Sequence, residues 1–150
     1  MKRTDYLTWK ECFTEMAVLI SKRSKDPKTQ VGAVIVDSDN VIVSVGYNGF
    51  PRGCSDDEFP WDKGEGLHNK KLYVCHAEMN AIINSNRDLH NCKIYTTLFP
   101  CHECTKLIIQ KKLSKVYYMD RKDNLSTKAS KKMLRAAGIK YKGILRRNCK

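Results

Sequence analysis

The sequence predicts an α/β protein, a three-layer α/β/α sandwich around a five-stranded mixed sheet, formed by a single domain over residues 1–150. A chain of 150 residues with a hydrophobic fraction of 41% suits one soluble globular domain with a proper core. The elements are expected in the order α-β-β-α-β-α-β-α-β. Strands and helices alternate after the first hairpin, and such alternation favours parallel neighbours with helices on the sheet faces.

The first predicted element is an amphipathic helix over residues 8–24, where apolar residues recur at helical spacing. Thr8 is expected to cap it, with Glu11 three residues later as the partner in a capping box. The next two apolar runs, 31–36 and 41–47, are separated by a short polar turn. They therefore predict two strands joined as a hairpin.

A long loop over residues 48–74, rich in Gly, Pro, Asp and Asn, follows the hairpin. A loop of this length in a compact domain is usually either functional or disordered. We expect a functional one, because it leads directly to a candidate metal ligand, His76. Beyond it, helices are predicted over 76–86, 102–112 and 125–137, and strands over 93–98, 116–119 and 139–145.

Composition excludes several classes of protein. No run of 18 or more apolar residues is present, which argues against a membrane span, and the N-terminus does not have the pattern of a secretory signal. Seven cysteines do not fit a fully paired disulfide framework. We therefore expect a cytoplasmic protein, or one of the host cytoplasm if the chain is viral, in which Cys12, Cys92 and Cys149 are ordinary thiols.

The net charge of +12 is unevenly distributed. Residues 1–105 carry 13 Lys/Arg and 14 Asp/Glu, a net of −1, whereas residues 106–150 carry 15 and 2, a net of +13. This basic third either attracts phosphates, on a nucleotide or a polymer, or is a solvated lysine-rich surface. Its only aromatic residues are Tyr117, Tyr118 and Tyr141. So few stacking side chains argue against single-stranded nucleic acid as the partner.

Two short runs carry the candidate chemistry, Cys-His-Ala-Glu at 75–78 and Pro-Cys-His-Glu-Cys at 100–104. His76, Cys101 and Cys104 can hold a zinc ion and leave one coordination position open, which is typical of catalytic rather than structural zinc sites. Both runs are expected at helix starts. There the free N–H groups and the partial positive charge stabilise thiolates.

Glu78 lies two residues after the histidine, where its carboxylate can move protons to and from a water at the open position. Our hypothesis is attack of the activated water on C4 of a cytosine ring, protonation of N3 by Glu78, and departure of the amino group as ammonia. A closed structural zinc site in a basic nucleic-acid binder is the alternative. A second metal site combining His68 with Cys54 or Cys75 is also conceivable.

From about residue 8 to residue 145 the chain resembles the deoxycytidylate (dCMP) deaminase family. His-Ala-Glu followed by Pro-Cys-x-x-Cys is the signature of zinc nucleobase deaminases in general. The run Gly-Tyr-Asn-Gly-Phe-Pro-Arg-Gly-Cys-Ser-Asp-Asp, at 46–57, narrows the resemblance to the dCMP enzymes. Ser-Lys-Arg-Ser-Lys-Asp-Pro at 21–27 and Gln-Val-Gly-Ala at 30–33 are also close to the family pattern.

The resemblance implies hydrolysis of dCMP to dUMP and ammonia, feeding thymidylate synthesis, with zinc on the three ligands and catalysis by Glu78. It implies a sugar contact from Asn48, phosphate contacts from Arg23 and Arg121, and a further substrate contact at Ala77. The alternatives are a deaminase acting on a base in tRNA or single-stranded DNA and a dual dCMP/dCTP deaminase.

The resemblance also implies regulation and assembly. Many family members are homohexamers, activated by dCTP with Mg²⁺ and inhibited by dTTP. The effector site is expected in the 46–57 run, where glycines let the backbone approach a ligand and polar side chains contact its sugar and base. The residues expected there are Gly49, Gly53, Ser55, Asp56 and Asp57.

Overall fold

The computed structural model describes residues 1–145 and contains a five-stranded mixed sheet in the order β2-β1-β3-β4-β5. The pairs β2–β1 and β1–β3 are antiparallel, and the pairs β3–β4 and β4–β5 are parallel. The predicted mixed sheet of five strands is therefore confirmed. Its strands are β1 Gly32–Val36, β2 Ile42–Tyr47, β3 Lys93–Leu98, β4 Lys115–Asp120 and β5 Lys140–Gly143.

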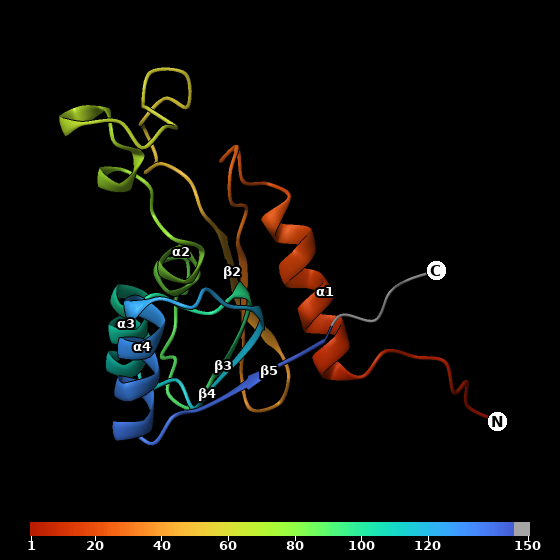
Figure 1. Ribbon diagram of the computed structural model, residues 1–150. Helices are drawn as coiled ribbons and strands as arrows, with labels where there is room; N and C mark the ends of the chain where they lie inside the picture. The colour runs from red at the N-terminus through yellow and green to blue at the C-terminus, as the bar shows by residue number, and fades with distance from the viewer. Residues whose placement is uncertain (146–150) are drawn as a thin grey trace.

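Helices cover both faces of this sheet (Figure 1). One helix, α1, lies alone on one face, and the other three lie together on the opposite face, which gives the predicted three layers. The helices are α1 Trp9–Ser21, α2 Ala77–Ile83, α3 His102–Gln110 and α4 Leu125–Ala136.

Two reciprocal hydrogen bonds between Thr8 and Glu11 fix the start of α1. The hydroxyl of Thr8 accepts a hydrogen bond from the backbone N–H of Glu11, and the Glu11 carboxylate accepts one from the backbone N–H of Thr8. This capping box, which the sequence predicts, satisfies two N–H groups at the first turn. The helix is three residues shorter than expected at its C-terminal end.

Alternation along β1 separates the core into two halves. Ala33 and Ile35 pack with α2, α3 and α4, whereas Val34 and Val36 pack with Phe13 and Ala17 of α1. Successive strand side chains point to opposite faces, so a continuous apolar strand serves both layers. The same alternation buries Tyr117 on the α1 side.

Two glycines let helices approach the sheet closely. A Cβ at Gly32 would lie 2.0 Å from the carbonyl oxygen of Ala17 in α1. A Cβ at Gly46 would lie 2.4 Å from the carbonyl oxygen of Ala77 and the nitrogen of Ala81, both in α2. The distance between each helix and its strand is thus set by the absence of a side chain.

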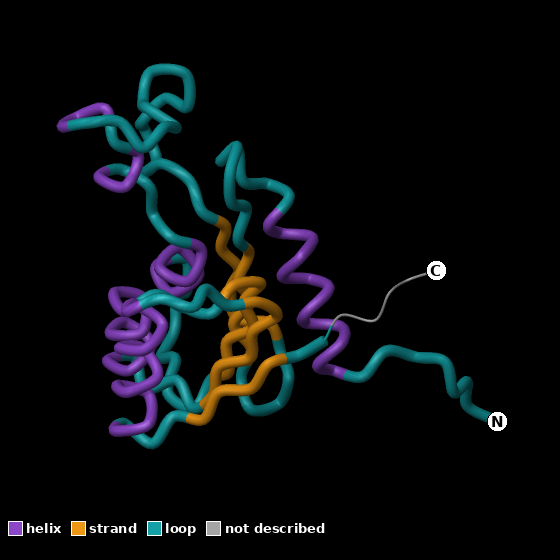
Figure 2. The backbone as a smooth tube through the Cα atoms, viewed as in Figure 1, coloured by secondary structure: helices purple, strands orange, loops and turns teal. Residues whose placement is uncertain are grey.

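The segment 48–74 lies beyond one end of the sheet (Figure 2). It is not structureless, because it contains two single-turn 3₁₀ helices, η1 Gly66–His68 and η2 Lys70–Leu72. Ring contacts join four of its aromatic residues into a small local core that the sequence pattern did not reveal. These residues are Phe50, Phe59, Trp61 and Tyr73.

The six cysteines within residues 1–145 are free thiols, and the expectation for Cys149 lies outside the described residues. Cys92 is buried and Cys12 is half-buried. Every helix within the described residues is too short or too polar to cross a membrane.

Candidate active site

The three predicted metal ligands meet where two helices begin. His76 is the N-cap residue of α2 and Cys101 is the N-cap residue of α3. The Cys101 sulfur accepts a hydrogen bond from the backbone N–H of Cys104, which brings both thiols to the same side of the first turn of α3. The two sequence runs, 75–78 and 100–104, therefore come together because the helices that they begin, α2 and α3, start next to each other.

The cluster has the dimensions of a zinc site. The Nδ1 atom of His76 lies 3.3 Å from the Cys101 sulfur and 3.5 Å from the Cys104 sulfur, and all three ligand atoms lie within 4.8 Å of one another. A tetrahedral zinc ion with bonds of about 2.1 Å to nitrogen and 2.3 Å to sulfur keeps such atoms about 3.5 Å apart. The residues present therefore fit zinc. In residues 1–145, no other group of three potential ligands brings its atoms together, including any built on His68, Cys54 and Cys75.

The electrostatics of the cluster favour a thiolate. A hydrogen bond from the thiol of Cys104 lowers the pKa of Cys101 to about 3, although burial opposes this shift, and the same side-chain hydrogen bond raises the pKa of Cys104. The hydrogen bond between His76 and Cys101 raises the pKa of His76, whereas burial and the charge of Lys122 act in the opposite direction. This arrangement favours the ionised form of Cys101, and a thiolate is the form that binds a metal cation.

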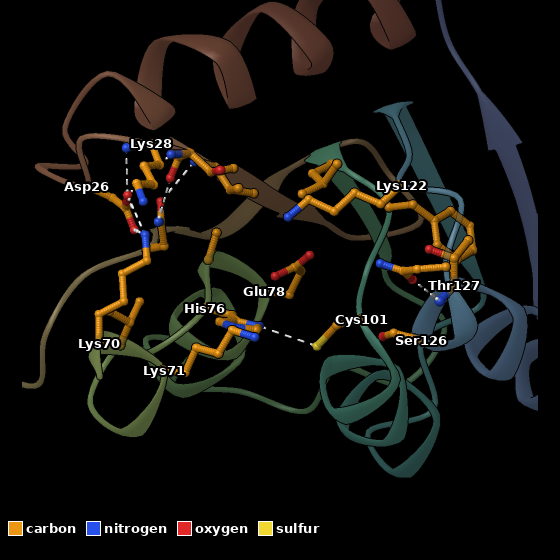
Figure 3. A pocket seen from close by; sticks show the side chains of 18 of the residues that line it. Asp26, Lys28, Lys70, Lys71, His76, Glu78, Cys101, Lys122, Ser126 and Thr127 are labelled. Carbon is orange, nitrogen blue, oxygen red and sulfur yellow. Dashed lines mark hydrogen bonds and ion pairs between the residues drawn. The ribbon is translucent and has the colours of Figure 1, made fainter. Parts of the chain in front are cut away.

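Glu78 lies in the first turn of α2 and is 4% exposed. Burial raises the pKa of its carboxyl group above the usual 4.5. A carboxyl group whose pKa moves toward neutrality can both accept and return a proton, which is the property required of a general acid–base group. The predicted position of Glu78 beside the metal ligands is seen in Figure 3.

His76, Glu78 and Cys101 line a cavity of about 480 Å³, a size suited to a small-molecule ligand. Asn48 lies in its wall, with its side chain held in place at both ends: Oδ1 accepts from the Val31 N–H and Nδ2 donates to the Thr29 carbonyl. One amide hydrogen and one lone pair of Asn48 are left for a ligand. Ala77 also lines the cavity. Five predicted site residues therefore line it, namely Asn48, His76, Ala77, Glu78 and Cys101.

The predicted phosphate contacts lie elsewhere in this chain. Arg23 is directed over the ring of Tyr47, with its guanidinium carbon 5.9 Å from the ring centroid, and lines a second cavity. Arg121 is exposed, and its backbone N–H donates to the side chain of Asp120. Neither lines the catalytic cavity. Its wall instead contains Lys28, Lys63, Lys70, Lys71 and Lys122.

A buried ion pair in the same wall was not expected from the sequence. Lys70 donates to both carboxylate oxygens of Asp26, at 2.6 and 2.8 Å. Burial opposes ionisation of Asp26, but the hydrogen bonds from Lys70 and from the backbone of Lys28 and Thr29 hold the pKa of its carboxyl below the usual range. Asp26 lies inside the family-like run 21–27, yet nothing in that run indicates a partner 44 residues away.

The second cavity has a volume of about 200 Å³ and lies beside the first, with Asn48 in the wall of both. Of the residues expected in an effector site, Gly49, Gly53 and Asp56 line it, whereas Ser55 and Asp57 do not. Gly53 has a φ of +89°, a conformation that favours glycine. Lys25 forms an ion pair with Asp56 at this cavity.

Three metal ligands with a buried glutamate, on a mixed sheet covered by helices on both faces, define a zinc-dependent deaminase of the cytidine deaminase fold. The family model of the cytidine and deoxycytidylate deaminase zinc-binding region matches residues 7–120. The chain belongs to this family.

Relatives place the chain near the deoxycytidylate deaminases. It is 55% identical to a probable deoxycytidylate deaminase of Drosophila melanogaster, over 94% of this chain and 74% of that protein. It is 49% identical to the deoxycytidylate deaminase of Mus musculus, over 94% of this chain and 82% of that protein. Among solved structures, the dCMP deaminase of the cyanophage S-TIM5, in complex with dCMP and dUMP, is 26% identical, with a TM-score of 0.73 over 90% of this chain and 96% of that one.

Proposed function

We propose that this protein hydrolyses dCMP to dUMP and ammonia. The single observation that carries the proposal is the buried carboxyl group of Glu78 beside three ligands that fit zinc, at one cavity. The names of the relatives at about half identity, and the nucleotides bound to the cyanophage enzyme, support dCMP as the substrate.

His76, Cys101 and Cys104 would hold the zinc, which supplies Lewis acidity at its open coordination position. Glu78 accepts the proton of the attacking water and delivers it to N3 of the cytosine ring. The same carboxyl group then takes the second proton from the hydroxyl now bonded to C4 and delivers it to the amino group, so that the C4–N bond breaks, C4–O becomes a carbonyl and ammonia leaves. Asn48 binds the deoxyribose through its remaining amide hydrogen and lone pair, and Ala77 packs against the substrate.

We also propose that nucleotides regulate this enzyme, as they do in many members of the family. The second cavity would bind dCTP with Mg²⁺ as an activator and dTTP as an inhibitor, in a homohexamer that supplies dUMP for thymidylate synthesis in the cytoplasm. The positions of Gly49, Gly53 and Asp56 in that cavity support this assignment. Ser55 and Asp57 would contribute through the conformation of the loop.

The test is ammonia release from dCMP by the zinc-loaded protein, with and without dCTP and Mg²⁺, beside parallel reactions on cytidine, dCTP and single-stranded DNA. Turnover of dCMP that dCTP increases supports both the substrate and the effector. Turnover of dCTP identifies a dual enzyme. Inactivity on dCMP with turnover of a base in single-stranded DNA or tRNA refutes the proposal and assigns the basic C-terminal third to a polymer.

A further inference from the structure

Asn48, which binds the deoxyribose in the proposed function, is held by the segment 24–31. The hydroxyl of Ser24 donates to the backbone carbonyl of Asn48 at 2.9 Å. The Val31 N–H donates to the side-chain oxygen of Asn48 at 2.8 Å, and the side-chain nitrogen donates to the Thr29 carbonyl at 2.9 Å. The orientation of the Asn48 amide therefore depends on where the backbone of Thr29 and Val31 lies.

A second segment, 70–75, holds the residue after Asn48. The N–H of Gly49 donates to the Cys75 carbonyl at 3.1 Å, and the N–H of Cys75 donates to the Gly49 carbonyl at 2.8 Å, which makes an isolated antiparallel bridge. This segment begins with the single turn η2, whose first residue is Lys70. The position of Asn48 thus depends on two segments that are about 40 residues apart in the chain.

The buried ion pair joins these two segments directly (Figure 3). The Oδ1 atom of Asp26 accepts from the ammonium group of Lys70 at 2.8 Å and from the backbone N–H of Thr29 at 3.2 Å. Thr29 is also the residue whose carbonyl accepts from the Asn48 amide. Through Thr29 the pair therefore reaches Asn48, and the 70–75 segment closes this ring of contacts.

We propose that the Asp26–Lys70 pair positions Asn48, so that the free hydrogen and lone pair of its amide meet the hydroxyl group of the deoxyribose. A hydroxyl both donates and accepts, which matches what is left on the amide, and dCMP has one sugar hydroxyl, at C3′. Asp26 and Lys70 act through other residues, so both are positioning rather than catalytic residues. The inference rests on the proposed function for the identity of the nucleotide.

The test compares two substrates on the zinc-loaded protein, dCMP and 2′,3′-dideoxycytidine monophosphate, which lacks the sugar hydroxyl. The variants are Asp26→Asn, the double variant Asp26→Asn/Lys70→Met, Asn48→Ala, and Asp26→Asn combined with Asn48→Ala. The double variant separates positioning from stability, because it leaves no buried charge without a partner but still lacks the link between the two segments.

Asp37→Asn is the matched control. Like Asp26, Asp37 accepts hydrogen bonds from two nearby backbone N–H groups, those of Asp39 and Val41, and forms an ion pair with a distant cation, Arg87, at 3.2 Å. It lies in the turn between β1 and β2 and lines neither of the two cavities. Its substitution therefore removes the same kind of arrangement at a place that does not contact Asn48.

In Asp26→Asn we expect the preference for dCMP over the dideoxy substrate, measured as the ratio of kcat/KM values, to fall at least about fivefold. The fall should come from the KM for dCMP, with kcat within about threefold of the wild-type value and the dideoxy substrate unaffected. The double variant should regain stability but not the preference, and Asp37→Asn should keep the preference. In the Asn48→Ala background, Asp26→Asn should cause no further loss, because both residues act on one contact.

Equal losses on the two substrates would overturn the proposal, since the pair would then serve the fold or the reaction as a whole. A preference that returns with stability in the double variant, or that survives in Asn48→Ala, would also overturn it. Calorimetric binding of dUMP and of its 2′,3′-dideoxy analogue separates this from failure of the proposed function. A protein that does not turn over dCMP, yet loses its preference for dUMP in Asp26→Asn, refutes the reaction and supports the positioning. A protein that turns over dCMP without any preference for the hydroxyl supports the reaction and refutes the positioning.

Discussion

The ammonium group of Lys70 lies within 2.8 Å of both carboxylate oxygens of Asp26, and both side chains are more than nine-tenths buried. This pair joins the segment after α1 to the long 48–74 segment, and both segments contribute to the cavity wall. A buried charge that loses its partner is costly, whereas replacing both charges by apolar groups is often nearly neutral.

Asp26→Asn should therefore lower the free energy of unfolding by about 3 kcal/mol at neutral pH, because it leaves the Lys70 ammonium buried without a counter-charge. Adding Lys70→Met to this variant should recover much of the loss. Urea denaturation of the zinc-loaded proteins measures both effects. A double variant less stable than Asp26→Asn alone would contradict this account.

The same pair gives the stability a defined dependence on pH. The pKa of Asp26 is lower in the folded protein than its ordinary value of 3.8. Its contribution is therefore fully present above that value and is lost as the pH falls through the lower, folded pKa. The difference in stability between the wild type and Asp26→Asn should be constant near neutrality and narrow below about pH 4. A difference that persists unchanged in acid would exclude ionisation of Asp26 as its source.

Glu78→Gln should keep the fold and the zinc but reduce turnover by at least about 10³-fold, since the amide cannot carry a proton. Metal analysis should show one zinc per chain, and ammonia release from dCMP should be close to background. The nucleotide should still bind, since the amide keeps the size of the side chain. Retention of activity within tenfold would remove Glu78 from the proposed chemistry.

Cys101→Ser should release zinc, because it removes one of the three ligands, the thiol whose lowered pKa favours the thiolate form. His102→Ala is the matched control on the same turn of α3. The ring of His102 lies next to Ser126, 2.9 Å from its hydroxyl, and is not part of the cluster. Zinc content after dialysis against a chelator should fall only in Cys101→Ser. Equal zinc loss in both variants would indicate damage to α3 rather than loss of a ligand.

Much of this architecture could be predicted from the sequence because its signals are local. The Thr8–Glu11 capping box lies within four residues, and the two metal runs within four and five. The sequence patterns located the four α-helices and the five strands of the described residues, but not the two 3₁₀ helices, and the predicted helix over 76–86 extends beyond the observed Ala77–Ile83. Helix ends depend on tertiary contacts as well as on composition, so such differences are expected.

The remaining features depend on contacts between distant residues. Asp26 pairs with Lys70 across 44 positions, and the lysines of the cavity come from three separate segments, after α1, within 48–74 and after β4. No spacing rule distinguishes Lys122 from its neighbour Arg121; only the path of the chain after β4 places one inside the cavity and the other outside. The metal site could be predicted from short runs, whereas the lysine-rich walls of its cavity required the fold.

The close approach of α2 to the sheet gives the last prediction. A Cβ at Gly46 would lie 2.4 Å from two backbone atoms of α2, so neither a rotamer change nor a flexible side chain can relieve the contact. Gly46→Ala should push α2 away from β2 and cost about 3 kcal/mol of stability. Because α2 carries His76 at its start and Glu78 in its first turn, zinc affinity and turnover should fall together.

Gly143→Ala is the matched control for Gly46→Ala, because among the described residues the three atoms nearest to a Cβ on this edge strand belong to Tyr118, at ordinary distances of 3.5 to 3.6 Å. We expect its unfolding free energy and zinc affinity to stay near those of the wild type. Urea denaturation and a zinc competition assay measure both quantities in the two variants. If Gly46→Ala instead matched the wild type in stability and zinc affinity, the strand contact would not be what fixes α2, and the position of the metal ligands would have to depend on α3 and on the 48–74 segment.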